Sequence, residues 1–170
     1  MSEKIREKLE QLGYDHRFKF SGKFKKYGFK FNDRRKTHAS PTILLVDVKL
    51  IDGDDEIDMT DHLWFNLTKG FKDLGILADD DIISLYGRVT EYTKGYQGSK
   101  IDVDKPIQID YKIERPSRVK LELSHPLTGP NMYRVWPDKA WETCNMIYDM
   151  YSLDYIKRSI RKPYPDQNLL

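Results

Sequence analysis

The stretch HLWFNLTKGFKDLGILADDDIISLYGRVTEY, residues 62–92, decides the predicted fold. It opens with a short apolar run, which is followed by Leu67, Phe71 and Leu74 at the spacing of successive helical turns. Gly75 comes next, and glycine commonly ends helices. Apolar and polar side chains then alternate, which is the period of a half-buried strand. The stretch therefore predicts a helix of about two to three turns in front of a strand.

Strands are also predicted on both sides of this stretch. Phe and Lys alternate over residues 16–31, but the alternation slips near Lys25, which predicts either a bulge or a tight turn. The run TILLVDVKLI, residues 42–51, is typical of a central strand, and the acidic segment 52–61 reads as turn and loop. A last strand is predicted over residues 107–123, with an interruption at its proline.

The predicted order is strand, strand, strand, short helix, strand, strand. This is the order of the OB-fold, a five-stranded Greek-key barrel that commonly binds oligonucleotides. A long first strand with a glycine and a bulge fits this fold, because that strand must curve around the barrel. An SH3-like barrel and a generic α+β sheet are the alternatives, and an SH3-like barrel normally lacks the helix. We therefore predict a mainly β protein, an OB-fold barrel with a short helix between strands 3 and 4 and a C-terminal helix.

Three parts are predicted along the chain: an N-terminal helix (1–13), an OB-fold domain (14–124), and a linker with a C-terminal helical appendage (125–170). The last part contains an aromatic stripe at helical spacings of 3 and 4, made of Trp141, Cys144, Tyr148, Tyr151 and Tyr155. It predicts a helix that ends near Ser159. Whether this helix packs on the barrel, forms a dimer or joins a binding groove is left open by the pattern.

Composition favours an ordinary globular domain. Of 170 residues, 39% are hydrophobic and 12% aromatic, enough to build a core. The single cysteine excludes an internal disulfide and predicts a packing role for Cys144. No stretch approaches the roughly 18 apolar residues of a membrane span, and the first residues lack an apolar signal region. The expected location is the cytoplasm, with no membrane partner.

Charge is segregated along the chain, although the net charge is only +2. Residues 14–38 carry six Lys and three Arg against two Asp, whereas residues 49–62 carry one Lys against six carboxylates. A chain of this kind has a basic side that attracts polyanions and an acidic side that repels them.

The strand that begins near residue 82 is the first candidate site. Its apolar face holds Ile83, Leu85 and Val89, and its other face combines phenol rings with cations. Stacking on an aromatic ring contributes roughly 1–3 kcal/mol per base, and cations attract phosphates. The competing interpretation is that the tyrosines only cover a solvated sheet face. The candidate nucleic-acid-binding residues here are Tyr86, Arg88, Tyr92 and Lys94, with Tyr96 and Lys100 from the following loop.

Two further candidates lie earlier in the chain. A basic stripe on the first strand would either contact phosphate or guard a sheet edge, while the phenylalanines between its cations are expected in the core. Trp64 is either a core residue at the start of the helix or a stacking platform. The stripe consists of Arg17, Lys19, Lys23 and Lys25, and the loop residues Arg34 and Arg35 continue it.

Catalytic and metal-binding patterns are not found. The four histidines lie far apart without ligand spacing, and no phosphate-binding glycine loop or nucleophile elbow occurs. We therefore expect no enzyme activity, no metal and no cofactor. A nuclease built on the acidic segments is a distant alternative.

Three segments carry a resemblance to a family: DHLWFNLTKGFKDLG (61–75), DDDIISLYGRVTEY.KGY.G (79–98, with dots at Thr93 and Gln97) and DYKIERPSRV (110–119). They resemble small proteins of phages, plasmids and mobile elements of Gram-positive bacteria, a group associated with OB-fold binding of single-stranded nucleic acids. The resemblance covers roughly residues 40 to 120 and includes no catalytic fingerprint. To the standard bacterial single-stranded-DNA-binding proteins the chain is similar only in architecture.

These observations together predict a single-stranded-DNA-binding protein. It would act without sequence preference, through stacking and phosphate contacts, and the resemblance implies a role in replication or transfer of a phage, plasmid or mobile element. The choice between DNA and RNA and any self-association are left open. The alternative is an accessory interaction protein that binds a host protein through its acidic face.

Overall fold

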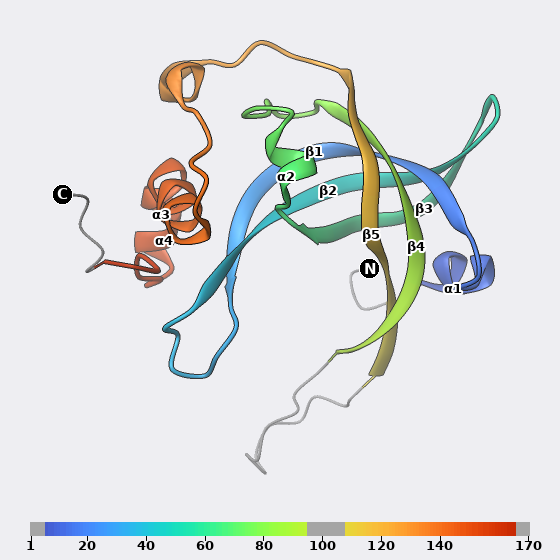
Figure 1. Ribbon diagram of the computed structural model, residues 1–170, viewed down its shortest axis with the longest axis horizontal. Helices are drawn as coiled ribbons and strands as arrows, with labels where there is room; N and C mark the ends of the chain where they lie inside the picture. Colours follow the sequence, from blue (N-terminus) through green and yellow to red (C-terminus); the bar gives the residue numbers. More distant parts are fainter. Residues whose placement is uncertain (1–5, 95–107, 166–170) are drawn as a thin grey trace.

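The computed structural model describes residues 6–94 and 108–165, and its centre is one curved, five-stranded antiparallel sheet (Figure 1). Its strands follow the order β3-β2-β1-β4-β5, and the short helix α2 (Lys69–Lys72) lies between β3 and β4 in the chain. The strands are β1 (Arg17–Phe31), β2 (Ala39–Asp52), β3 (Asp55–Asn66), β4 (Ile82–Lys94) and β5 (Gln108–Leu123). The strand order and the helix position are those of an OB-like barrel, so the predicted mainly β class is confirmed.

The sheet stays open between its two edge strands, since the described residues form no ladder between β3 and β5. Arg6, which precedes α1 (Glu7–Leu12), bridges these edges. Its guanidinium donates to the carbonyl oxygens of His62 on β3 (3.4 Å) and Tyr111 on β5 (2.8 Å). Its backbone N–H donates to the buried carboxylate of Asp110 (3.0 Å). Arg6 therefore ties the two edges together at one end of the sheet.

The predicted slip in the first strand is a bulge and not a turn. Phe20 and Phe24 point into the core, a register shift follows between Phe24 and Lys26, and Tyr27 then takes over the inward direction. β1 therefore continues unbroken to Phe31. Because a bulge adds one residue to one strand of a pair, it reverses which parity faces inward and bends the strand.

The strand β3 is longer than the sequence predicted, and the helix after it is shorter. The acidic segment 52–61 is mostly strand and not loop, because β2 and β3 pair tightly from Asp52 and Asp55 onward. Ladder pairing here outweighs the low strand propensity of aspartate. The helix α2 has a single turn instead of two to three, and the chain turns at Gly75, whose φ is 80°.

β5 also continues where a break was predicted, because Pro116 lies on an edge strand. The strand pairs only with β4, and such an edge tolerates the missing N–H of proline. The irregularity appears instead as register shifts, with positive φ at Arg115 and Arg118.

The C-terminal part packs on the sheet. It contains the turn η1 (Gly129–Tyr133), then α3 (Ala140–Met150) and α4 (Ser152–Lys157), so the single helix that was predicted is broken. The break falls at Tyr151, whose hydroxyl accepts a hydrogen bond from the backbone N–H of Tyr27 (3.1 Å). The helix α3 packs against β1 and β2. Of the three roles left open for this part, packing on the sheet is therefore observed.

Cys144 on α3 is fully buried, and its burial raises the pKa of the thiol to about 12. Packing is thus the role that the structure gives this residue. Among the residues described, no helix has the length and apolar character needed to cross a bilayer.

The Arg6 bridge predicts a large effect of a single substitution. Arg6→Ala should lower the free energy of unfolding by about 1–3 kcal/mol, because it removes the guanidinium hydrogen bonds to the carbonyl oxygens of His62 and Tyr111, which join the two edges. Urea denaturation followed by circular dichroism measures this change. Gln11→Ala, which removes an exposed amide from the same helix, should stay within about 0.5 kcal/mol of the wild type. Equal midpoints for the two variants would contradict the bridge.

Candidate nucleic-acid interface

The predicted alternation along β4 is confirmed. Ile83, Leu85 and Val89 are at most 1% exposed, and the aromatic and basic residues lie half-buried on the opposite face. Those residues are Tyr86, Arg88 and Tyr92. The side chain of Lys94, and Tyr96 and Lys100 entirely, lie outside the described residues.

The rings on this face already have cations of the protein beside them. The Arg118 guanidinium lies 5.4 Å from the centroid of the Tyr86 ring, and the Lys112 ammonium lies 5.5 Å from that of Tyr92. The Tyr92 hydroxyl also accepts a hydrogen bond from Arg6 (3.0 Å). A base that stacked on either ring from the same side would have to displace a cation.

Arg88 is paired as well, because its guanidinium contacts the Glu114 carboxylate at 2.8 Å. The β4 face is therefore cationic and aromatic, as predicted, but partly engaged with the protein itself.

The basic stripe of β1 is divided between two places. Arg17 and Lys19 pair in register with Arg88 and Tyr86, so they extend the β4 face. Farther along β1, Lys23 forms an ion pair with Asp47 (3.6 Å), and Lys25 is exposed next to the bulge.

Trp64 is not a core residue at the start of the helix. It lies near the end of β3, and its side chain points away from the core that Leu63 and Phe65 enter. The residue is 43% exposed, and its ring lies over Gly28, where a Cβ would be only 3.1 Å from the indole. The Lys26 ammonium lies 6.0 Å from the ring, the outer limit of a cation–π contact.

Trp64 borders a cavity of about 610 Å³, which we call the basic groove. One wall is the end of β1 with the loop 32–38, and the other is the C-terminal segment 158–165. Besides Trp64, Phe29, Phe31 and Tyr155 supply aromatic surface, and the lining residues described include no carboxylate. The basic side chains that line it are Lys26, Arg35, Lys36, Arg158, Arg161 and Lys162. Of the predicted site residues, Trp64 and Arg35 therefore meet here.

Most of this positive charge is not compensated. Arg158 lies 3.1 Å from the Asp154 carboxylate, and Lys162 lies 3.2 Å from that of Asp149. The other four cations of the groove have no carboxylate partner among the described residues. A groove of this composition attracts phosphates and offers flat surfaces to bases.

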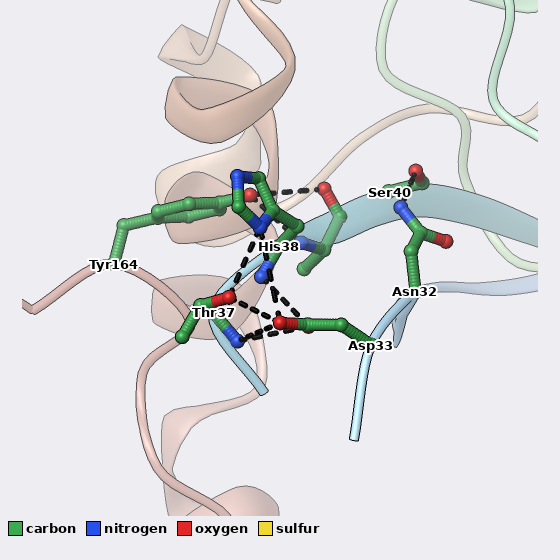
Figure 2. Close-up of polar contacts among 7 residues, drawn as sticks. Asn32, Asp33, Thr37, His38, Ser40 and Tyr164 are labelled. Carbon is green, nitrogen blue, oxygen red and sulfur yellow. Dashed lines mark hydrogen bonds and ion pairs between the residues drawn. The ribbon is translucent and has the colours of Figure 1, made fainter. Parts of the chain in front are cut away.

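Hydrogen bonds hold the two walls in place (Figure 2). In the loop, the Asp33 carboxylate accepts from the backbone N–H groups of Thr37 (2.9 Å) and His38 (3.1 Å). The Thr37 hydroxyl also donates to this carboxylate, and these bonds lower the pKa of Asp33. Between the walls, the Tyr164 hydroxyl accepts from the Ala39 N–H (2.7 Å) and donates to the Ala39 carbonyl (3.2 Å). These hydrogen bonds therefore fix the positions of both walls of the groove.

A second cavity, the seam groove, continues from the first. It has a volume of about 690 Å³, lies between the end of β3 and the edge of β5, and shares Phe29 and Trp64 with the basic groove. Lys112 lines it and also lies above Tyr92, so the seam groove leads toward the β4 face. The two grooves and the β4 face are therefore neighbouring surfaces.

The sequence left open whether the C-terminal segment joins a binding groove, and it did not show which surface that segment would meet. Arg161 and Arg35 are far apart in the chain, and nothing in their local pattern shows that they face one groove. The sequence shows the cluster of cations after α4, but it does not show which other segment these cations lie next to. Within the described part of the chain, no three His, Cys, Asp or Glu side chains gather as metal ligands would.

Comparison of the chain with protein-family models gave no match, and comparisons with curated proteins and with solved structures gave none either.

The charge of the basic groove can be tested without a ligand. The ratio of iodide to caesium quenching should be higher for Trp64 than for free N-acetyltryptophanamide, because the surrounding cations concentrate anions at the ring. The difference should shrink as sodium chloride is added, because salt screens the groove. Stern–Volmer plots of the wild type and of Trp64→Phe isolate the contribution of Trp64. A ratio equal to that of N-acetyltryptophanamide would show that the groove has no excess positive potential.

Proposed function

We propose that this protein binds single-stranded DNA in the basic groove. The observation that carries the proposal is the exposed Trp64 ring in a groove with four uncompensated cations and no described carboxylate. Aromatic platforms inside a basic groove are the usual means of binding single strands.

Single strands fit this surface better than a duplex does. A base can stack on the Trp64 indole only if one of its faces is free, and in a duplex both faces are stacked on neighbouring bases. Lys26, Arg35 and Arg161 line the same groove as the ring, so they are available to the phosphates that flank a stacked base. Stacking supplies an attraction that every base shares, and the cations supply one that salt weakens.

The β4 face would extend this surface. Tyr86 and Tyr92 lie across β5 from the seam groove, and a long oligonucleotide could reach them past Lys112. Because Arg118 and Lys112 already lie at the rings, we assign this face a smaller share of the affinity.

The biological setting rests on the family resemblance alone. It points to replication or transfer of a phage, plasmid or mobile element. Single-stranded intermediates of such processes arise in the cytoplasm, which is where the proposed activity would take place.

An acidic surface favours a second candidate function, that of an accessory protein that binds a host protein. The hairpin between β2 and β3 exposes Asp52, Asp54, Asp55, Glu56 and Asp58, and Ile57 among them is 41% exposed. This hairpin lies at the opposite end of β2 from the basic loop (Figure 1). An apolar side chain within a ring of carboxylates would suit a basic protein partner.

Binding to oligonucleotides of mixed sequence tests the main proposal. The wild type should bind the single strand more tightly than the matching duplex, and Trp64→Ala should weaken single-strand binding by roughly 1–3 kcal/mol through the loss of one stacked base. Fluorescence anisotropy of a labelled oligonucleotide measures both affinities. Failure of the wild type to bind either form would refute the function.

The double variant Tyr86→Ala with Tyr92→Ala compares the two surfaces. It should weaken binding by less than Trp64→Ala does, since protein cations already lie at both rings. The same anisotropy titration measures it. A larger loss in the tyrosine variant would place the main site on the β4 face instead.

The phosphate contacts have a separate signature in the salt dependence. Arg161→Ala should reduce the slope of log K against log salt by about 0.7, the amount expected for one lost phosphate contact on a single strand. Lys157→Ala is the matched control, because Lys157 is an exposed cation of the adjacent helix that does not line the groove. Identical slopes in the two variants would show that Arg161 makes no phosphate contact and that the C-terminal segment is not part of the interface.

A further inference from the structure

The seam groove contains a side-chain amide, a group that is absent from the described lining of the basic groove. Asn66, at the end of β3, and Thr68, in front of α2, both line it with exposed side chains. The Thr68 side chain does not cap the helix α2, and the side-chain amide of Asn66 has no hydrogen bond with any other described residue. Both groups are therefore available to a ligand.

The remainder of the seam groove suits a flat molecule that carries charge at one side. Phe65 and Ile113, at 5% and 4% exposure, form apolar surface beneath the opening, and Trp64 stands where the seam groove meets the basic groove. The volume of about 690 Å³ lies inside the range of about 300–1,000 Å³ that is usual for small-molecule sites. A nucleobase needs this combination of apolar faces and a polar end.

Charges at the rim suit the phosphates of the same strand. Lys30, Lys112 and Arg115 line the seam groove, against one carboxylate, that of Glu114. Glu114 is occupied by Arg88 at 2.8 Å, so its charge is largely compensated. A nucleotide that continued past Trp64 would therefore meet cations on both sides of the opening.

We infer that the seam groove receives one base of the bound strand and that Asn66 reads its edge. This inference rests on the proposed function, because it assigns a part of the same strand to a second pocket. An amide carries both a donor and an acceptor, so it can form two hydrogen bonds with a base edge that presents the complementary pair. One such pair discriminates between bases by about 5- to 150-fold. The protein would then bind single strands generally and still prefer some bases over others.

Homopolymers test the preference directly. Equal-length oligonucleotides of deoxyadenosine, deoxycytidine and thymidine should bind the wild type with affinities that differ by about 5-fold or more. Asn66→Ala should bring these affinities together, while Gln11→Ala, which removes an exposed amide from α1 outside both grooves, should leave the differences unchanged. Thermal unfolding of each variant confirms that the fold is retained, as expected for exposed side chains.

A charged variant distinguishes hydrogen bonding of residue 66 to the base edge from a role of this residue in the shape of the groove alone. Asn66→Asp leaves two acceptors and no donor, which matches the N1–H and N2–H groups of guanine. Relative to an all-thymidine strand, a strand in which guanines alternate with thymidines should therefore gain affinity in this variant. A residue that only shapes the groove would not produce this gain for the strand that contains guanine.

The outcomes distinguish the inference from the proposed function. Equal binding of all homopolymers by the wild type, or a preference that survives Asn66→Ala, would overturn base reading and leave single-strand binding intact. If the wild type binds no oligonucleotide at all, both the inference about Asn66 and the proposed function are refuted.

Discussion

The candidate interface depends on the hydrogen bonds by which Tyr164 holds the start of β2. They join residues separated by 125 positions in the chain, and the Asn145 amide in turn bonds the backbone N–H and carbonyl of Tyr164 (3.0 Å each). Because of this docking, Arg161 faces Arg35 across one groove. Without it, the cations after α4 would be a solvated tail with no aromatic surface beside them. The packing of α3 on the sheet is thus the step that turns two basic segments into one surface.

Holding like charges together disfavours the free protein, although only slightly at an exposed site. Their repulsion is screened over about 10 Å at 0.1 M salt. Lys36 lies 5.9 Å from the Phe31 ring and Lys26 lies near Trp64, and such cation–π contacts offset part of it by roughly 0.5–1 kcal/mol each at exposed sites. A bound polyanion would remove the remaining repulsion. The same arrangement therefore lowers stability a little in the free protein and would contribute to the proposed binding.

Local patterns in the sequence predicted what depends on local chemistry. The alternation of Ile83, Leu85 and Val89 identified β4 and its inner face, and the slip near Lys25 identified the bulge. The apolar run HLWF lacks alternation, so it could not show that Trp64 points outward. That direction is set by the register of β3 against β2. The extent of β3, the single turn of α2 and the break at Tyr151 likewise arise from tertiary pairing, and the basic groove arises from contacts between distant segments.

The separation of charge along β2 has a consequence for how the protein would meet DNA. In an antiparallel meander, successive hairpins lie at opposite ends of the shared strand, so the basic loop 32–38 and the acidic hairpin of β2 and β3 point in opposite directions (Figure 1). A polyanion would attract the first and repel the second, which would orient the approaching protein with its basic loop toward the proposed ligand. The acidic hairpin also keeps the net charge at +2, which limits indiscriminate adhesion to anionic surfaces. The acidic hairpin would thus support the proposed single-strand binding without itself having a partner.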